Sequence, residues 1–478
     1  MTTEITPVPT PHSHLNRTRL ALYCFTAALG GLLFGFDTIV INGTIPFIRQ
    51  SFQMTESMVG WTVASALIGC VIGALVIGKP GDTYGRKAML KVTAVLFTVS
   101  ALGAGFAVNL EMLVIFRFIG GLAIGGASVM APMYISEISP AHLRGRLVAI
   151  AQLAIVIGAL MSFFVNFLVA DMGINAWRYM FLAGGVPAVF FFFLLFLVVQ
   201  SPRWLVAVGR IEEARAVIRE INGPGANVDR EIEDIAHSLQ REGGSVKAPL
   251  FKPPYLRLVL IGIAVGMFNQ LTGINTVMYY STDILMNAGL AGKAAIATAA
   301  GGIPDMVAAA AEVRSALKQS VFIGGTNVVM TLIGMALIDF VGRRRLLLVG
   351  SLGMSAMLGV FSWAFFTNHT QGYLPLGILI GFQIFFAASQ GVTIWVLLAE
   401  MFPNAILARG SSMGSFSHWF FNALFSYLFP VVAHAFGVGY CFAFYSISTL
   451  ISFFFFKKFL METKSQSLEE LELTVLAH

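Results

Sequence analysis

Long apolar stretches alternate with short polar ones along this chain of 478 residues. An α-helix needs about 20 predominantly apolar residues to cross the hydrocarbon core of a membrane. The runs of that length lie near 19–43, 58–79, 89–109, 111–136, 146–170, 179–200, 256–287, 317–340, 345–366, 373–401, 409–434 and 437–459. The pattern predicts an all-α membrane protein with twelve transmembrane helices in two six-helix bundles.

Polar segments separate and flank the two sets of runs. Residues 201–255 are rich in Arg, Glu and Asp, with pairs such as Glu212 and Arg215 at the spacing that stabilises a solvated helix. The first run contains Asp37 and no small-residue cleavage site, so we expect a spanning helix rather than a signal peptide. The predicted segments are an N-terminal tail (1–18), an N-terminal six-helix bundle (19–200), a helical linker (201–255), a C-terminal six-helix bundle (256–459) and a C-terminal tail (460–478).

Charge differs between the two sides of the predicted membrane. The tails, the linker and one set of alternate loops hold most of the Lys and Arg residues. The other set holds only four, which are Arg49, Arg178, Lys293 and Arg314. Because cytoplasmic loops carry an excess of Lys and Arg, we expect both termini and the linker to be cytoplasmic. The low cysteine usage and short external loops indicate the inner (plasma) membrane of a cell.

Composition supports the same class of protein. Apolar residues make up 57% of the chain and charged residues 11%, against roughly 25% charged residues in a soluble domain. The 42 Phe and 48 Gly suit helices that pack closely in lipid. The three cysteines show no disulfide or metal-ligand spacing. The net charge of +6 follows from the cytoplasmic loops, so we expect no nucleic-acid partner. We also expect no metal and no cofactor.

Two signatures of the first half recur in the second. Residues 82–86 (DTYGR) follow the second run and residues 339–343 (DFVGR) follow the eighth. Residues 137–140 (EISP) and 400–403 (EMFP) end the fourth and tenth runs. One copy would be explained by a tight turn with cationic anchors, but four symmetric copies favour an internal repeat. Secondary transporters are built from such repeats, which rock about a central site.

Five more motifs complete the pattern. They are residues 30–37 (GGLLFGFD), 117–121 (RFIGG), 201–205 (SPRWL), 270–275 (QLTGIN) and 462–464 (ETK). With them the chain resembles the sugar porter family of the major facilitator superfamily over nearly its whole length, and in particular the bacterial proton-coupled sugar symporters. The resemblance implies alternating-access transport of a monosaccharide with a proton, by a protein that works as a monomer.

The chain departs from the family pattern at several positions. The residues concerned are Gln200, Asn269, Val392, Leu407 and Met461, where the family usually has Glu, Gln, Pro, Arg and Pro. The segment 281–316 is also longer than the resemblance implies, and we have no functional account of it. These departures leave the sugar open: a pentose, a hexose and a cyclic polyol are all compatible with the pattern.

A sugar is recognised by amides and aromatic rings in a largely apolar cavity. The resemblance implies a sugar site that comprises Gln152, Asn269, Gln270, Asn275, Asn327, Trp395 and Asn422. His418 and Trp419 replace an amide-Trp pair that is common in the family, and we include both in the predicted site. Amides are costly in lipid and should therefore face the bundle interior, although an amide that only bonds a neighbouring helix would do so too. For His418 we favour contact with a sugar hydroxyl over proton handling.

Asp37 is the predicted proton site, and Arg117 is its predicted partner. An acid within a membrane is by default a functional candidate. A carboxylate beside a guanidinium prefers to be ionised, whereas one desolvated away from it prefers a proton. Alternating access would then couple proton movement to sugar movement. The alternative for this pair is a static structural ion pair.

Charged residues of the repeated signatures are predicted to form ion pairs that hold the cytoplasmic side closed. They are Asp82, Arg86, Glu137, Arg144 and Arg146 in the first half, and Asp339, Arg343, Glu400 and Arg409 in the second. Leu407, in the place of an arginine, predicts weaker pairing in the second half.

The alternatives to a symporter are a passive facilitator, a membrane sugar sensor and an enzyme. A passive facilitator would share every feature except the need for Asp37. A membrane sugar sensor would carry a long cytoplasmic tail, which we do not expect after the last helix. An enzyme is disfavoured, because the chain has no nucleophile elbow, metal-ligand cluster or phosphate-binding glycine loop.

Overall fold

The computed structural model describes residues 15–140, 142–223, 227–243, 249–253, 255–290, 306–403 and 406–462. Within these ranges the chain forms helices and no strands. Eleven helical stretches are long and apolar enough to cross a membrane. One of them, Arg144–Leu197, has 54 residues and would measure roughly 80 Å if it were straight, about twice the depth of a bilayer. It breaks at Gly173, where φ is +76°, so the described part of the chain makes twelve crossings.

The first half of the protein contains six of these crossings. They are α1 (Arg17–Ser51), α2 (Glu56–Val76), α4 (Arg86–Gly105), α5 (Leu110–Ile138), α6 (Arg144–Val169) and α7 (Ala176–Leu197). The short helix α3 (Gly78–Tyr84) joins α2 to α4, and the 3₁₀ helix η1 (Ala170–Asn175) joins α6 to α7. Three short helices follow, which are α8 (Pro202–Ala207), α9 (Ile211–Asn222) and α10 (Val228–Gly243).

The second half contains the other six crossings, two of which are broken. One crossing consists of α11 (Leu256–Leu271) and α12 (Ile274–Leu285), continued by the π-helix η2 (Met286–Leu290). Another consists of α16 (Leu374–Ala388) and α17 (Gln390–Glu400). The unbroken ones are α14 (Met306–Val341), α15 (Arg343–Phe366), α18 (Leu407–Phe436) and α19 (Val438–Phe459). Residues 291–305 of the long segment 281–316, whose role we could not assign, lie outside the described residues.

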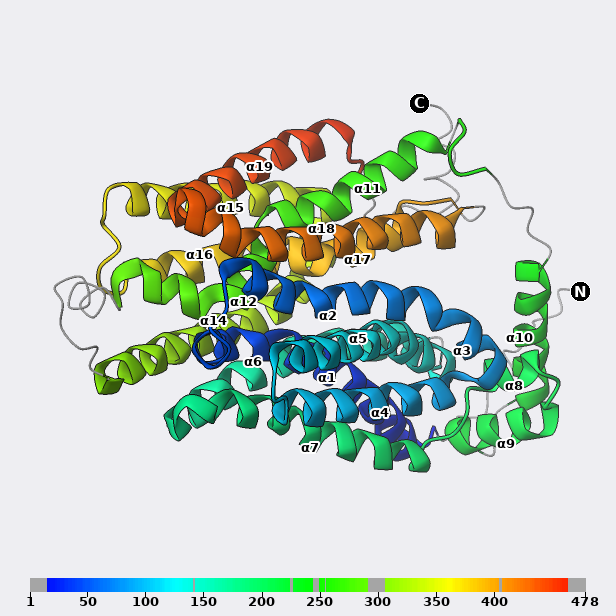
Figure 1. Ribbon diagram of the computed structural model, residues 1–478. Helices are drawn as coiled ribbons and strands as arrows, with labels where there is room; N and C mark the ends of the chain where they lie inside the picture. The colour runs from blue at the N-terminus through cyan, green and yellow to red at the C-terminus, as the bar shows by residue number, and fades with distance from the viewer. Residues whose placement is uncertain are drawn as a thin grey trace, which may run out of the picture.

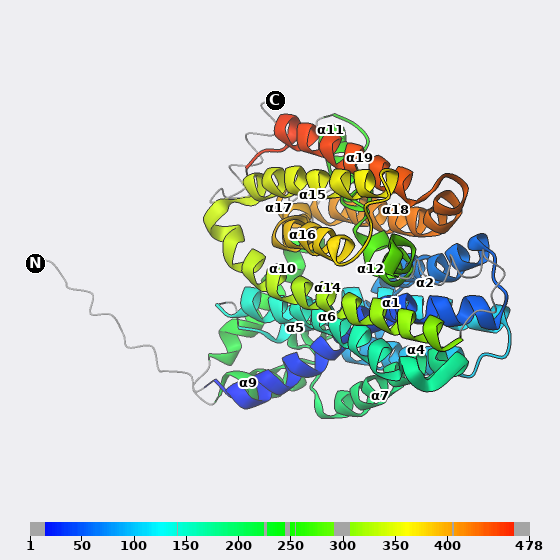
Figure 2. The same ribbon diagram turned by 90° about the vertical axis from the view of Figure 1, so that its left-hand side faces the viewer.

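The two halves lie side by side, with their helices running roughly parallel to one long axis (Figure 1). They meet where α1 packs on α12, α2 on α18 and α6 on α14. Helices α8 to α10 gather at one end of the molecule, close to α3 (Figures 1 and 2). The backbone N–H of Asn16 donates to the carbonyl of Ile221 in α9, so α1 begins at this end and finishes at the opposite one. The twelve-helix, two-bundle fold expected from the sequence is confirmed.

Glycines let α5 approach α2 closely. A β-carbon on Gly121 would lie 2.0 Å from the carbonyl oxygen of Ala66, and one on Gly125 would lie 2.1 Å from that of Cys70. Neither distance is compatible with a side chain unless the helices separate. Small residues at such contacts are the usual means by which membrane helices pack without a hydrophobic driving force.

We therefore expect Gly121→Ala to lower the melting temperature of the purified protein, because the added methyl group forces α2 and α5 apart. Overpacking of this kind costs about 1–3 kcal/mol. The matched control is Gly325→Ala in α14, where nothing lies within 4 Å of the added carbon. Thermal-shift curves of the two variants and the parent protein measure the difference. Equal melting temperatures for the two variants would contradict this packing argument.

Candidate functional site

Helices α1 and α5 bring Asp37 and Arg117 together inside the first half. The Nη1 atom of Arg117 lies 3.2 Å from Oδ2 of Asp37 and donates to the backbone carbonyl of the same residue at 2.8 Å. The arginine side chain is 2% exposed and the aspartate side chain 13%. Gly120 leaves room for the carboxylate, since a β-carbon there would lie 2.9 Å from Oδ2. The result is an almost fully enclosed ion pair within the membrane-spanning region.

A small cavity adjoins this ion pair at the contact between the two halves. Its lining includes Arg117 and Thr38 from the first half, and Tyr279 (α12) and Trp419 (α18) from the second. Its volume is about 10 Å³, roughly the space that one water molecule needs. The buried arginine therefore lies across a small gap from a predicted sugar-site residue, Trp419.

Gln270 is the centre of a polar network in the second half. Its Nε2 atom lies 3.0 Å from both Oδ1 of Asn269 and Nδ1 of His418, and its Oε1 atom accepts from Asn275 at 2.7 Å. Asn269 in turn donates to Gln390 at 3.4 Å, and Gln390 donates to Ser351 at 3.2 Å. The network thus joins α11, α12, α15, α17 and α18, and every amide in it has a partner.

The break between α11 and α12 explains how two residues five positions apart meet. Gly273 has φ +76° and ψ +13°, a left-handed conformation that favours glycine. A β-carbon on it would lie 2.7 Å from the ring of Tyr445. The break lets Asn275, in the first turn of α12, reach back to Gln270 in the last turn of α11. Discontinuous helices of this type mark substrate sites in secondary transporters.

Aromatic rings continue from this network toward the first half. The ring of Trp395 (α17) lies 4.8 Å from that of His418, measured between centroids. His418 lies 5.3 Å from Trp419, and Trp419 lies 5.8 Å from Phe34 in α1. Trp395 is 37% exposed, whereas the two α18 side chains are buried. The row of rings connects the amide network to the helix that carries Asp37.

The remaining predicted sugar-site residues lie outside this network. Asn422 donates to the hydroxyl of Tyr279 at 3.3 Å and thereby reaches the small cavity. Asn327, in α14, accepts a long hydrogen bond of 3.5 Å from Thr331. Gln152 is half-buried on α6 and makes no side-chain hydrogen bond to another described residue. These two amides are brought neither to each other nor to Gln270 by hydrogen bonds.

Three residues that the structure places here, Gln390, Ser351 and Tyr279, are not among the predicted site residues. A signal was present for Gln390, because an amide inside an apolar run carries the same cost as those that were selected. Ser351 and Tyr279 had no such signal, since serine and tyrosine are common in spanning helices.

Two ion-pair clusters lie at the α8–α10 end of the molecule, one in each half. Arg86 lies 3.0 Å from Asp82 and 3.1 Å from Glu137. Arg343 lies 3.2 Å from Asp339 and 3.0 Å from Glu400. Arg144 and Arg146 are exposed at the start of α6 and make no ion pair with the other described residues, whereas Arg409 lies in the first turn of α18.

Each cluster is supported by a side chain that caps a helix. The Oε1 atom of Gln200 accepts from the backbone N–H of Lys87 at 3.1 Å. The carboxylate of Glu462 accepts from the N–H groups of Arg343 and Arg344 at 2.8 and 3.2 Å. Gln200, one of the departures from the family pattern, therefore caps α4 as Glu462 caps α15, but without a charge.

The opposite end of the molecule holds polar contacts between the two halves. Arg49 at the end of α1 lies 2.9 Å from Asp283 in α12 and 3.1 Å from Glu56 in α2. Asn42 donates to the hydroxyl of Ser281 at 2.8 Å, and Arg314 of α14 lies 2.9 Å from Asp171. By contrast, the pairs that Arg86 makes with Asp82 and Glu137, and those that Arg343 makes with Asp339 and Glu400, each lie within one half.

Comparisons with known proteins agree with this architecture. The family model "Sugar (and other) transporter" matches residues 23–474. The arabinose-proton symporter of Bacillus subtilis (strain 168) is 32% identical over 477 residues, covering 98% of each chain. The D-xylose-proton symporter of Escherichia coli (strain K12) is 35% identical over 490 residues, covering 93% of this chain and 94% of the relative.

Solved structures of the xylose transporter XylE from E. coli are similar as well. The inward-open conformation gives a TM-score of 0.81 at 32% identity, covering 95% of this chain and 99% of that one. XylE bound to 6-bromo-6-deoxy-D-glucose gives 0.74 at 32% identity, covering 96% and 99%.

The fold and the site define a multi-pass membrane transporter with two repeated six-helix halves. The chain belongs to the sugar (and other) transporter family, within the major facilitator superfamily. The resemblance found in its motifs is thereby confirmed. The family and the relatives are transporters rather than enzymes.

Proposed function

We propose that this protein is a secondary active transporter that moves a monosaccharide together with a proton by alternating access. One observation carries the proposal: Arg117, the buried partner of Asp37, and Trp419, which adjoins the amide network, line the same small cavity. A proton site and a sugar site so placed can be coupled by small movements of the halves. Two relatives of this chain are an arabinose-proton symporter and a D-xylose-proton symporter, which supports transport of a sugar together with a proton.

The amide network is the proposed sugar site. Amides both donate and accept hydrogen bonds, so Gln270, Asn275 and His418 can exchange their mutual bonds for bonds to sugar hydroxyls. The rings of Trp395 and Trp419 offer apolar faces beside them. Because Asn269 is held by Gln390 and Ser351 behind it, we expect it to act chiefly by positioning Gln270.

The proton is proposed to bind Asp37. Pairing with Arg117 favours the carboxylate, and separation from it in a desolvated site favours the acid. A cycle that alternates between these states carries one proton with each sugar. The membrane potential then supplies about 2.3 kcal/mol per 100 mV for each proton, enough for roughly fiftyfold accumulation at about 1.4 kcal/mol per tenfold change.

The described conformation is proposed to be open toward the cytoplasm. Its polar contacts between the halves lie at the end opposite α8–α10, and its similarity is greater to inward-open XylE than to the sugar-analogue complex. We place the α8–α10 end, both termini and the ion-pair clusters on the cytoplasmic side of the plasma membrane, because the Lys and Arg residues concentrate there. The opposite end, with Arg49, is then external, and the working unit is a monomer.

Proteoliposomes provide the test of the proposed function. A panel of pentoses, hexoses and cyclic polyols is added to de-energised vesicles that hold the protein, and the pH of the medium is recorded. We expect one sugar to cause alkalinisation as protons enter with it, and protein-free vesicles serve as the control. Entry of a labelled sugar with no pH change would make the protein a passive facilitator. No entry of any sugar would favour a sensor.

Removing the ion pairs of Arg49 at the external end is expected to change the ratio between molecules open to the outside and molecules open to the cytoplasm. We expect Arg49→Gln to raise the population of molecules open to the outside severalfold, because it removes both ion pairs that join α1 to α2 and α12. Double electron–electron resonance spectroscopy, which measures the distance between spin labels at Gln53 and Tyr373, reports that population. Arg178→Gln is the matched control, since the hydrogen bonds of Arg178 to Asn175, Gly105 and Ala107 all lie within its own half. An unchanged distance distribution in Arg49→Gln would exclude this role.

A further inference from the structure

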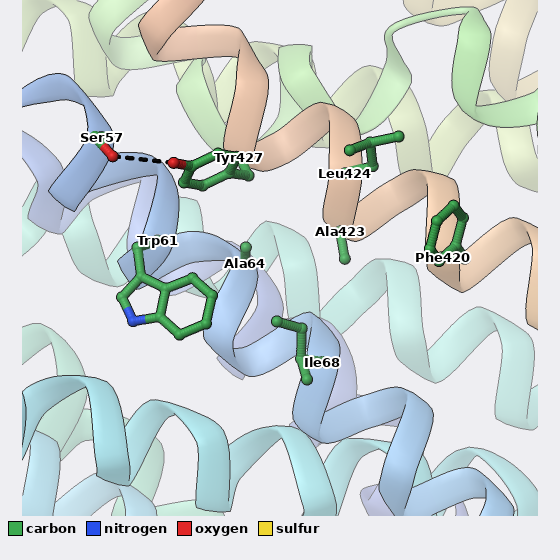
Figure 3. Close-up of a pocket in the computed structure, with 8 residues that line it drawn as sticks. All are labelled: Ser57, Trp61, Ala64, Ile68, Phe420, Ala423, Leu424 and Tyr427. Carbon is green, nitrogen blue, oxygen red and sulfur yellow. Dashed lines mark hydrogen bonds between the residues drawn. The ribbon is translucent and has the colours of Figure 1, made fainter.

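An apolar groove lies between α2 and α18, away from the polar network (Figure 3). Its volume is about 510 Å³, and it is lined by Ser57, Trp61, Ala64, Ile68, Phe420, Ala423, Leu424 and Tyr427. The hydroxyls of Ser57 and Tyr427 bond to each other at 3.0 Å at one end of the groove. The remaining walls are aliphatic and aromatic, so the groove suits a ligand without polar groups.

The groove opens on the outer surface of the spanning helices. Trp61 and Phe420 are each 49% exposed. On another face of α18, Asn422 and Ser426 are buried; Asn422 donates to Tyr279 of α12, and Ser426 donates to Asn422. The face of a spanning helix that is turned away from the buried polar interior of the bundle contacts lipid. Any occupant that enters from the side therefore enters from the membrane.

The length and depth of the groove match one half of a bilayer. From Ser57 to Ile68 the helix rises roughly 16 Å, and one leaflet contributes about 15 Å of hydrocarbon. The Ser57 end adjoins Glu56, which pairs with Arg49 at the charged rim of the external side. The groove thus runs from the external interface to the middle of the membrane, which is the path of a single acyl chain.

The two walls of the groove belong to different halves of the protein. The helices touch at the external end, where a β-carbon on Gly60 would lie 2.3 Å from the carbonyl oxygen of Tyr427. Toward the middle of the membrane the groove separates them (Figure 3). A rocking movement of the halves changes the distance between the walls, so the groove has this width in only one state.

We propose that the groove binds one acyl chain of an external-leaflet phospholipid, and that the bound chain favours the conformation open to the cytoplasm. A ligand shifts a conformational equilibrium when it binds one state better than the other. Rocking toward the state open to the outside separates the two walls, so the acyl chain contacts both walls only in the conformation open to the cytoplasm. The inference rests on the proposed function only for the movement of the halves. Lipid binding itself requires neither sugar nor proton.

Native mass spectrometry of the full chain tests the binding. The protein is purified in detergent and supplied with palmitoyl-oleoyl-phosphatidylethanolamine. We expect one tightly held phospholipid per chain, lost in Ala423→Phe because the phenyl group fills the groove. Ala443→Phe is the matched control, as Ala443 is also half-buried but lies on α19, outside the groove. Leu424→Trp is a second groove-filling variant, in case Ala423→Phe does not fold.

Equal retention of lipid by the groove-filling variants and the control would overturn the proposal, as would a parent protein that holds no phospholipid. A dimer that loses its contact in Ala423→Phe, with no lipid bound, would assign the groove to a second copy of the chain instead. A protein that holds the lipid in the expected way but transports no sugar would refute the proposed function alone.

The effect on conformation has a separate readout. Spin labels at Tyr84 in the first half and Phe340 in the second report the opening at the cytoplasmic side. We expect added phospholipid to move the parent protein and Ala443→Phe toward the longer distance, and to leave Ala423→Phe unchanged. A parent protein that binds the lipid without any change in distance would overturn the conformational part of the inference.

Discussion

Replacing Asp37 by Asn is expected to abolish uphill sugar accumulation while sugar exchange across the membrane continues. The amide cannot release a proton, so the step that couples the cycle to the membrane potential is lost. Its shape and its capacity to bond Arg117 remain, so the halves can still rock with sugar bound. Accumulation should fall from roughly fiftyfold at 100 mV to equilibrium with the outside concentration.

Two measurements on the same vesicles check this result. Accumulation of labelled sugar is followed under an imposed potential, and exchange is followed by counterflow without one. Asp229→Asn is the control, because Asp229 is exposed on α10 and pairs with Arg215 of α9, away from the site and from the contact between the halves. If Asp37→Asn accumulates sugar as the parent does, Asp37 is a structural partner of Arg117. If it loses exchange as well, the pair holds the fold of the site rather than the proton.

The fold could be predicted from the sequence because lipid imposes strict limits. A spanning helix needs a long apolar run, so the count of runs gave the count of crossings. The breaks were harder to predict. The break at Gly273 has a glycine at its centre, whereas Ser389, which separates α16 from α17, is neither glycine nor proline. Its φ of −125° and ψ of −89° depend on the packing of neighbouring helices.

The site could be predicted only in part. The cost of a charge in lipid singles out Asp37 and Arg117 from sequence alone, and their contact needs only that α1 and α5 face each other. The amides posed a different problem, because every buried amide carries a similar cost. Which of them meet depends on the rotation of each helix, which sequence spacing does not fix. Gln390 joins Gln270 through Asn269, whereas Gln152 and Asn327 make no hydrogen bond to the described residues of this network.

Truncation of Gln270 to Ala is expected to weaken sugar binding by about 5- to 150-fold. The change removes the group that Asn269, Asn275 and His418 share. An unsatisfied buried polar group costs about 1–3 kcal/mol, and at about 1.4 kcal/mol per tenfold change that range gives the expected loss. The dissociation constant of the sugar identified in the vesicle assay, measured by isothermal titration calorimetry, checks the prediction.

The same substitution at another buried amide shows whether the loss of binding is specific to Gln270. Gln319 in α14 is 4% exposed, and Gln319→Ala removes the same atoms outside the network. If both variants weaken binding equally, the loss reflects general loosening of the helices, and Gln270 has no particular role. If Gln270→Ala alone weakens binding while both variants keep the same melting temperature, the sugar contacts the network. We then expect Asn275→Ala to weaken sugar binding less than Gln270→Ala does, because Asn275 is bonded to the network through Gln270 alone.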